Sequence, residues 1–193
     1  MNTTKEMTDA MMPMHDFPLD APHWWGFAAL PEEMEYPYNG EENPLTLICQ
    51  FRYEEGMVYV FADLNYFFGD MDADGGHLGE WDRHLYRVLY APTRLNLHLH
   101  EIYTESGEPA VPEPEALDAP HTRGEASAVL SPATCFRDEV EQDYPGYQVL
   151  LQLDENDAIG LRFYDCGALF FLIRPEDLKA KRFDKTICVL YSY

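Results

Sequence analysis

The 193-residue chain has the length of one domain, and its 46% hydrophobic content supplies enough apolar material for a sizeable core. Its 35 Asp and Glu against 13 Lys and Arg give a net charge of -22. That charge disfavours binding to nucleic-acid phosphates and to anionic membranes, and no apolar stretch reaches the roughly 20 residues of a membrane span. It favours cations or a basic protein partner, although the charge could also serve only solubility.

The N-terminal segment mixes Met, Thr, Asp and Pro and has no apolar stretch typical of a signal peptide. We therefore expect a flexible tail over residues 1–20 and a single domain over residues 21–193. The cysteines form no C-x-x-C pair, and three lie in apolar runs, where we expect free core thiols. This pattern fits a reducing, cytoplasmic setting. The four cysteines are Cys49, Cys135, Cys166 and Cys188.

The first half of the chain predicts mainly strands. Prolines and aromatics over residues 21–44 predict irregular backbone packed over a core. TLICQFRY (46–53) and GMVYVFAD (56–63) then predict a hairpin, and HLYRVLYA (84–91) predicts a further strand. RLNLHLHEIY (94–103) alternates apolar and polar residues, as a half-buried strand does.

The second half opens with a proline-rich stretch, residues 104–133, that predicts a long surface excursion or a joint between two halves. Ser131-Pro132 could cap a helix that ends before Pro145. YQVLLQLD (147–154), GLRFYD (160–165), ALFFLI (168–173) and TICVLYSY (186–193) predict strands, and RPEDLKAKR (174–182) predicts a short helix. The expected fold class is α+β, with a predominantly antiparallel or mixed β-sheet and a few short helices.

A faint internal repeat suggests two similar lobes related by duplication. LICQF around Gln50 resembles LLQL around Gln152, and an aspartate follows each glutamine by 13 residues, at Asp63 and Asp165. An aromatic pair comes after each, at 67–68 and 170–171. The alternative is chance similarity between two apolar β-hairpins.

The stretch GDMDADGGHLGEW contains the strongest candidate for a metal site. Asp70, Asp72 and Asp74 match positions 1, 3 and 5 of a calcium loop, and Gly75 matches position 6. Trp81 stands at position 12, where a bidentate glutamate is needed, so the stretch is not an EF-hand. The three carboxylates could still hold calcium weakly, on the order of 10⁻⁴ to 10⁻³ M; the alternative is a solvated acidic turn.

Other candidates have weaker signals. His98 and His100 would share one face of a strand, where they could bind a transition metal if His84 or Glu80 supplied a third ligand. The alternative is a solvated strand face. Cys166 lacks the base and the electropositive setting of a nucleophile, and its apolar neighbours predict a core thiol instead. The amide side chains of Gln50 and Gln152 lie inside apolar strands. Neighbouring backbone groups should form their hydrogen bonds, or the two amides could line a pocket.

The sequence also contains features that resemble the YwqG-like family, a bacterial group of unknown function. WWGFAALPEEMEYPYNGEENPLTLICQ (24–50) resembles its opening, and YQVLLQLDENDAIGLRFYDCGALFFLIRPEDL (147–178) resembles its C-terminal core. The family tends to have Trp-Gly-Asp-Ala-Gly at positions 163–167; Asp165 and Gly167 match, and the other three positions differ. The resemblance covers residues 22–193 and implies a compact, β-rich α+β domain without known catalytic residues.

No nucleophile elbow, phosphate loop, dinucleotide fingerprint or H-E-x-x-H motif is present. Together with the net charge of -22, this predicts a cytoplasmic, non-enzymatic module that binds a basic protein partner, with no nucleic-acid or membrane partner. The resemblance implies a bacterial source. Some YwqG-like relatives lie near toxin systems, so the resemblance implies an immunity-like role. The alternative is a metal-dependent enzyme or a calcium-stabilised domain that uses the acidic loop over residues 70–82.

Overall fold

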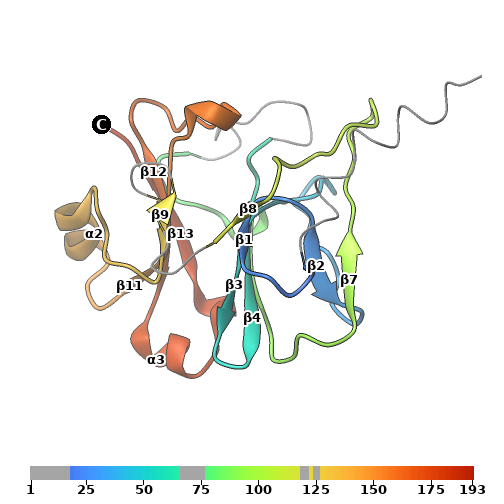
Figure 1. The fold of residues 1–193 in the computed structure, drawn as a ribbon. Helices are drawn as coiled ribbons and strands as arrows, with labels where there is room; N and C mark the ends of the chain where they lie inside the picture. Colours follow the sequence, from blue (N-terminus) through green and yellow to red (C-terminus); the bar gives the residue numbers. More distant parts are fainter. Residues whose placement is uncertain (1–17, 66–76, 118–121, 124–126) are drawn as a thin grey trace, which may run out of the picture.

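The computed structural model describes residues 18–65, 77–117, 122–123 (backbone only) and 127–193 (Figure 1). The helices are α2 (Arg137–Asp143) and α3 (Pro175–Lys179), with 3-10 turns η3 (Arg83–Leu85), η4 (Asp157–Ile159) and η5 (Phe183–Lys185). The strands are β1 (His23–Trp24), β2 (Ala28–Pro31), β3 (Thr46–Tyr53), β4 (Gly56–Ala62), β5 (Gly79–Glu80), β6 (Tyr86–Ala91), β7 (Leu97–His100), β8 (Glu115–Ala116), β9 (Thr122–Arg123), β10 (Ser127–Val129), β11 (Gln148–Asp154), β12 (Ala168–Ile173) and β13 (Ile187–Tyr191).

The described strands form three antiparallel sheets, so the protein is a mostly-β member of the α+β class. The first large sheet has the order β6-β4-β3-β1-β8, and the second has the order β5-β13-β12-β11-β10-β9. A small third sheet pairs β2 with β7. No helix within the described ranges is long and apolar enough to cross a membrane.

The sheets and helix α2 are arranged in layers. The two large sheets share a hydrophobic core that includes Trp24, Val60, Leu151 and Phe171. The outer face of the first sheet packs against β2 and β7, and the outer face of the second packs against α2 (Figure 1). Strands β4 and β12 are therefore covered on both faces, which explains why their sequences are continuous apolar runs.

The strand predictions for β3, β4, β6, β11, β12 and β13 are confirmed. The prediction of a strand over residues 160–165 (GLRFYD) is wrong. This segment is a tight loop in which Tyr164 has a left-handed φ of 61°. The strand predicted over residues 94–103 is limited to β7, because Asn96 has a φ of 54° and breaks the extended backbone.

The helix expected after Ser131-Pro132 begins later than predicted. Helix α2 starts at Arg137, and its N-cap position is Phe136, which has a left-handed φ of 47° and makes no side-chain capping hydrogen bond. Residues 130–136 cross the outer face of the second sheet before the helix starts. The proline-rich stretch over residues 104–133 contains β8 in the first sheet and β9 and β10 in the second, so it connects the two sheets.

The two large sheets have matching registers. Gln50 lies opposite Tyr59 and follows a register shift between Leu47 and Cys49. Gln152 lies opposite Phe170 and follows an equivalent shift. When the two sheets are aligned on these glutamines, Phe170 corresponds to Tyr59. The repeat in the sequence instead aligned residues 170–171 with residues 67–68.

Two glycines also occupy matching places. Gly56 begins β4 and Gly167 directly precedes β12. A Cβ atom at Gly56 would collide with the carbonyl oxygen of Ala91. One at Gly167 would collide with the carbonyl oxygen of Phe163 and would also lie 2.8 Å from the carbonyl oxygen of Tyr191. Each glycine thus allows a close approach to the neighbouring strand that no larger residue would permit.

Candidate functional site

The predicted metal ligands Asp70, Asp72 and Asp74 lie outside the described residues. The chain is anchored on both sides of that segment. Asp63 is buried, its carboxylate accepts a hydrogen bond from Asn39 Nδ2 at 2.8 Å, and its backbone N–H donates to Leu85. Because the three aspartates themselves are not described, the predicted calcium site stays a prediction.

His98 and His100 do lie next to each other on β7. Their ring centroids are 5.3 Å apart, and the ring centroids of Tyr36 and His100 are 5.6 Å apart. Burial and the neighbouring His98 lower the pKa of His100, which favours its neutral form. No group of three or more His, Cys, Asp or Glu able to hold a metal ion occurs among the residues that the structure describes. Neither His84 nor Glu80 therefore completes a site with this pair.

The cysteines occupy two kinds of environment. Cys49 and Cys188 are buried, and burial raises the pKa of both thiols. The prediction of a core thiol at Cys166 is wrong: the residue is exposed, because it lies in the loop before β12 with a left-handed φ of 53°. Cys135 is half-buried, and burial followed by the charge of Asp154 raises its pKa to about 11.

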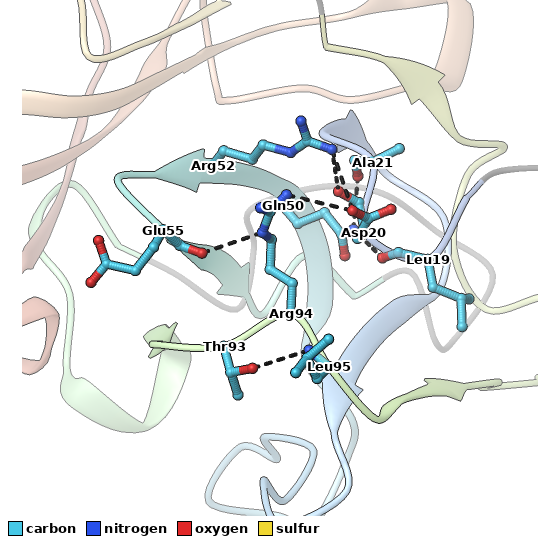
Figure 2. Close-up of polar contacts among 9 residues, drawn as sticks. All are labelled: Leu19, Asp20, Ala21, Gln50, Arg52, Glu55, Thr93, Arg94 and Leu95. Atoms are coloured by element: carbon cyan, nitrogen blue, oxygen red, sulfur yellow. Dashed lines mark hydrogen bonds and ion pairs between the residues drawn. The ribbon is translucent and has the colours of Figure 1, made fainter.

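Gln50 is fully buried, and its amide satisfies backbone groups, as predicted. Its Nε2 atom donates to the carbonyl oxygens of Leu19 at 3.0 Å and Ala21 at 2.9 Å (Figure 2). Its Oε1 atom accepts from the backbone N–H of Ala29 at 3.5 Å. The side chain thus fastens the residues before β1 and the start of β2 onto the outer face of the first sheet.

Gln152 plays the same part on the second sheet. Its Oε1 atom accepts from the backbone N–H of Thr134 at 2.9 Å, and its Nε2 atom contacts Thr134 Oγ1 at 2.8 Å and Cys135 Sγ at 3.3 Å. The two glutamines are consequently structural clamps on the segments that cross each sheet, and neither faces an open pocket in the described structure.

The clamp at Gln50 positions Asp20 beside two arginines (Figure 2). Asp20 Oδ2 lies 3.4 Å from Arg52 Nη2 and 3.5 Å from Arg94 Nη1. Arg94 Nε also donates to the carbonyl oxygen of Glu55 at 3.3 Å. These half-exposed groups fix residue 20 against β3 and the loop before β7, so the cluster is a structural tie in which one carboxylate is shared by two arginines.

Five of the 13 Lys and Arg of the chain lie close together in the sequence around α3. Residues 174–185, which include α3, contain five Lys and Arg against three Asp and Glu, whereas residues 18–65 contain nine Asp and Glu against one Arg. Several of these cations are already paired with carboxylates. The pairs include Arg182 with Asp177, Lys181 with Glu54 and Glu55, and Lys185 with Asp184. Away from α3 the surface is therefore dominated by unneutralised carboxylates.

A groove of about 380 Å³ lies between α2, residues 130–133 and the start of β11. Its apolar lining consists of Leu130, Pro132, Ala133, Val140, Tyr147 and Val149. The polar side chains at its edge include Arg137 and Glu141, which form an ion pair at 2.9 Å. Sequence reasoning missed this groove, since it depends on how residues 130–136 cross the sheet; the acidic pattern of RDEVEQD (137–143) was the available signal.

Comparison with known protein families gives a match in the second half of the chain. Residues 114–191 match a family model described as a domain of unknown function (DUF1963). The matched residues run from β8 to β13, and they include α2, α3 and the groove. No curated protein matches the chain. The comparison agrees with an uncharacterised domain and assigns no activity to it.

Proposed function

We propose that this chain is a non-enzymatic protein-interaction module whose acidic surface binds a basic protein partner. The observation that carries the proposal is the net charge of -22, with five of the 13 Lys and Arg gathered in residues 174–185. A field of this kind attracts a positively charged partner and speeds its encounter at low salt. The resemblance to the YwqG-like family supports a bacterial, cytoplasmic setting and an immunity-like role for the module.

A peptide selection tests this proposal. Random peptides displayed on phage would be selected against the full chain at about 0.15 M salt, where exposed charges more than about 8 Å apart are largely screened. We expect peptides rich in Lys and Arg that bind in a sequence-dependent way, so that scrambled peptides of equal charge bind more weakly. If scrambled and selected peptides bind equally, the surface acts only as a general polyanion and the proposal fails.

The second candidate is a calcium-stabilised domain or a metal-dependent enzyme, favoured by the spacing of Asp70, Asp72 and Asp74 before Gly75. Thermal unfolding in calcium, magnesium and zinc tests it, because a ligand of the folded state alone raises the midpoint. A calcium-specific rise that Asp72→Asn abolishes would support a site. Similar small shifts with every divalent ion, retained in the variant, would contradict it.

We further infer that the two large sheets are two copies of one duplicated unit. The support lies in the equivalent registers around Gln50 and Gln152 and in the matching places of Gly56 and Gly167. The first residue after β1, Trp25, and the first residue after β10, Leu130, also have the same backbone conformation and the same kind of hydrogen bond. Trp25 and Leu130 both have left-handed φ values, and each donates its backbone N–H to the residue at the register shift of its sheet.

A further inference from the structure

We propose that the groove beside α2 is the docking site for the basic partner, and that it takes an extended segment with an apolar side chain flanked by Lys or Arg. The inference rests on the proposed function, since the partner's positive charge comes from there. The groove has the volume of a typical ligand pocket, about 380 Å³ against a usual lower bound of about 300 Å³. It is large enough for one bulky aliphatic or aromatic side chain and part of the backbone that carries it.

The corresponding surface of the first sheet is covered by apolar side chains, and it shows how the groove could be filled. Leu45 and Leu47 lie at the places that correspond to Tyr147 and Val149. Both leucines are buried in one cluster with residues of the β2 segment, and Tyr36 there donates its hydroxyl to the carbonyl oxygen of Leu45 at 2.6 Å. On the first sheet the chain therefore covers this surface with its own apolar side chains.

The second sheet leaves the corresponding surface open. Trp25 is 1% exposed, whereas its counterpart Leu130 is 43% exposed. The residue after Trp25, Gly26, donates its backbone N–H to the carbonyl oxygen of Pro112, so an extended stretch of the chain runs alongside that position. Helix α2 covers only part of the second sheet, through Phe136 and Val140. An apolar segment from a partner would complete the layer that β2 and β7 provide on the first sheet.

The charges around the groove specify a basic occupant. Helix α2 exposes four acidic side chains and one arginine, and that arginine is paired with Glu141. The exposed acids are Asp138, Glu139, Glu141 and Asp143. At the Tyr147 end of the groove, the guanidinium of Arg174 lies 4.5 Å from the centre of the tyrosine ring. Lys and Arg of the partner should therefore lie along α2, and its apolar side chain should enter between Leu130 and Val149.

Binding of the selected basic peptides to the full chain tests the site with two variants. Leu130→Asn removes an apolar wall, and asparagine tolerates the left-handed backbone found there, so the fold should be retained. Glu139→Gln combined with Glu141→Gln removes two charges along α2. We expect each variant to weaken binding at least about tenfold, the effect of losing an interface anchor.

Matched controls alter similar residues elsewhere. Leu95→Asn changes another exposed leucine, and Glu33→Gln with Glu35→Gln removes the same charge beside β2. These controls should change the affinity by less than about threefold. Peptides that bind all variants equally would overturn the site and leave the proposed function standing, whereas the absence of any sequence-dependent basic peptide would overturn both. A dimer in sedimentation that Leu130→Asn dissociates would also overturn the site, since a second copy would then occupy the groove.

Discussion

At the scale of single residues, His23 couples stability to pH. The side chain is 3% exposed, and its Nδ1 atom lies 2.6 Å from the carbonyl oxygen of Trp25, to which it must donate. Burial lowers the pKa of His23, so the folded protein favours the neutral ring. The unfolded chain binds a proton near pH 6.5, and the folded state does so only at lower pH.

His23 should consequently stabilise the fold fully above pH 6.5 and progressively less as the pH falls below that value. Between pH 6.5 and 5.5 the free energy of unfolding should fall, by less than the about 1.4 kcal/mol per pH unit that a difference of one full proton would give. Urea unfolding of the wild type and of His23→Asn across this interval measures it, since carboxylates titrate alike in both proteins and asparagine can still donate to Trp25. Equal pH slopes in the two proteins would show that His23 does not contribute.

Alkylation should distinguish the four thiols. Iodoacetamide reacts with an accessible thiolate, and in the described structure Cys166 is the exposed cysteine. Cys49 and Cys188 are buried, and the raised pKa of Cys135 keeps it protonated at pH 8. Mass spectrometry of the native protein should therefore find one modified residue, at Cys166, and Cys166→Ser should remain largely unmodified. Equal labelling of Cys135 would contradict its assigned environment.

Residue environments were only partly predictable from the sequence. The amides of Gln50 and Gln152 were expected to be satisfied, because an unsatisfied buried amide is costly inside an apolar strand. Cys166 was assigned to the core on its apolar neighbours, and that assignment was wrong. Left-handed backbone at residues 164 and 166 turns the loop outward, and no local residue type signals such a conformation outside glycine and asparagine.

At the scale of elements, the two glutamine clamps should contribute alike. Gln152→Met leaves the N–H of Thr134 without its acceptor, and Gln50→Met leaves two backbone carbonyl groups without their donor. Each change should lower the free energy of unfolding by about 1 kcal/mol, the net contribution of a hydrogen bond, because the bonds lost are partly buried. Chemical denaturation measures both.

Gln142→Met provides the control, because Gln142 is exposed on α2 and should change stability by less than about 0.5 kcal/mol. If Gln50→Met and Gln152→Met were as mild as this control, the clamps would not hold the crossing segments. A large effect at one glutamine alone would weaken the inference of a duplicated unit.

Strands were more predictable than helix starts and irregular segments. Apolar runs such as ALFFLI identify β12 because both of its faces are buried. The start of α2 was placed five residues too early, since Ser131-Pro132 resembles a helix start while residues 130–136 in fact follow the sheet. The strand pairing of β8 with β1 depends on contacts between residues about 90 positions apart, which local patterns do not encode.

At the scale of the whole molecule, the distribution of charge is the property most closely tied to the proposed function. Exposed ion pairs such as Arg137 with Glu141 contribute little to stability, so the carboxylates are not explained by folding. The excess of negative charge away from α3 also disfavours the compact state, because like charges repel one another. A requirement for a basic partner would account for keeping this surface.

The most direct test is the salt dependence of the affinity for a selected basic peptide, measured by calorimetry from about 0.05 M to about 0.5 M salt. Over this range the Debye length falls from about 14 Å to about 4 Å, so attraction between exposed charges should be strongly screened. We predict that Kd rises at least about tenfold and then levels off, because the apolar contact in the groove persists. A Kd that stays constant or decreases with added salt would contradict the account.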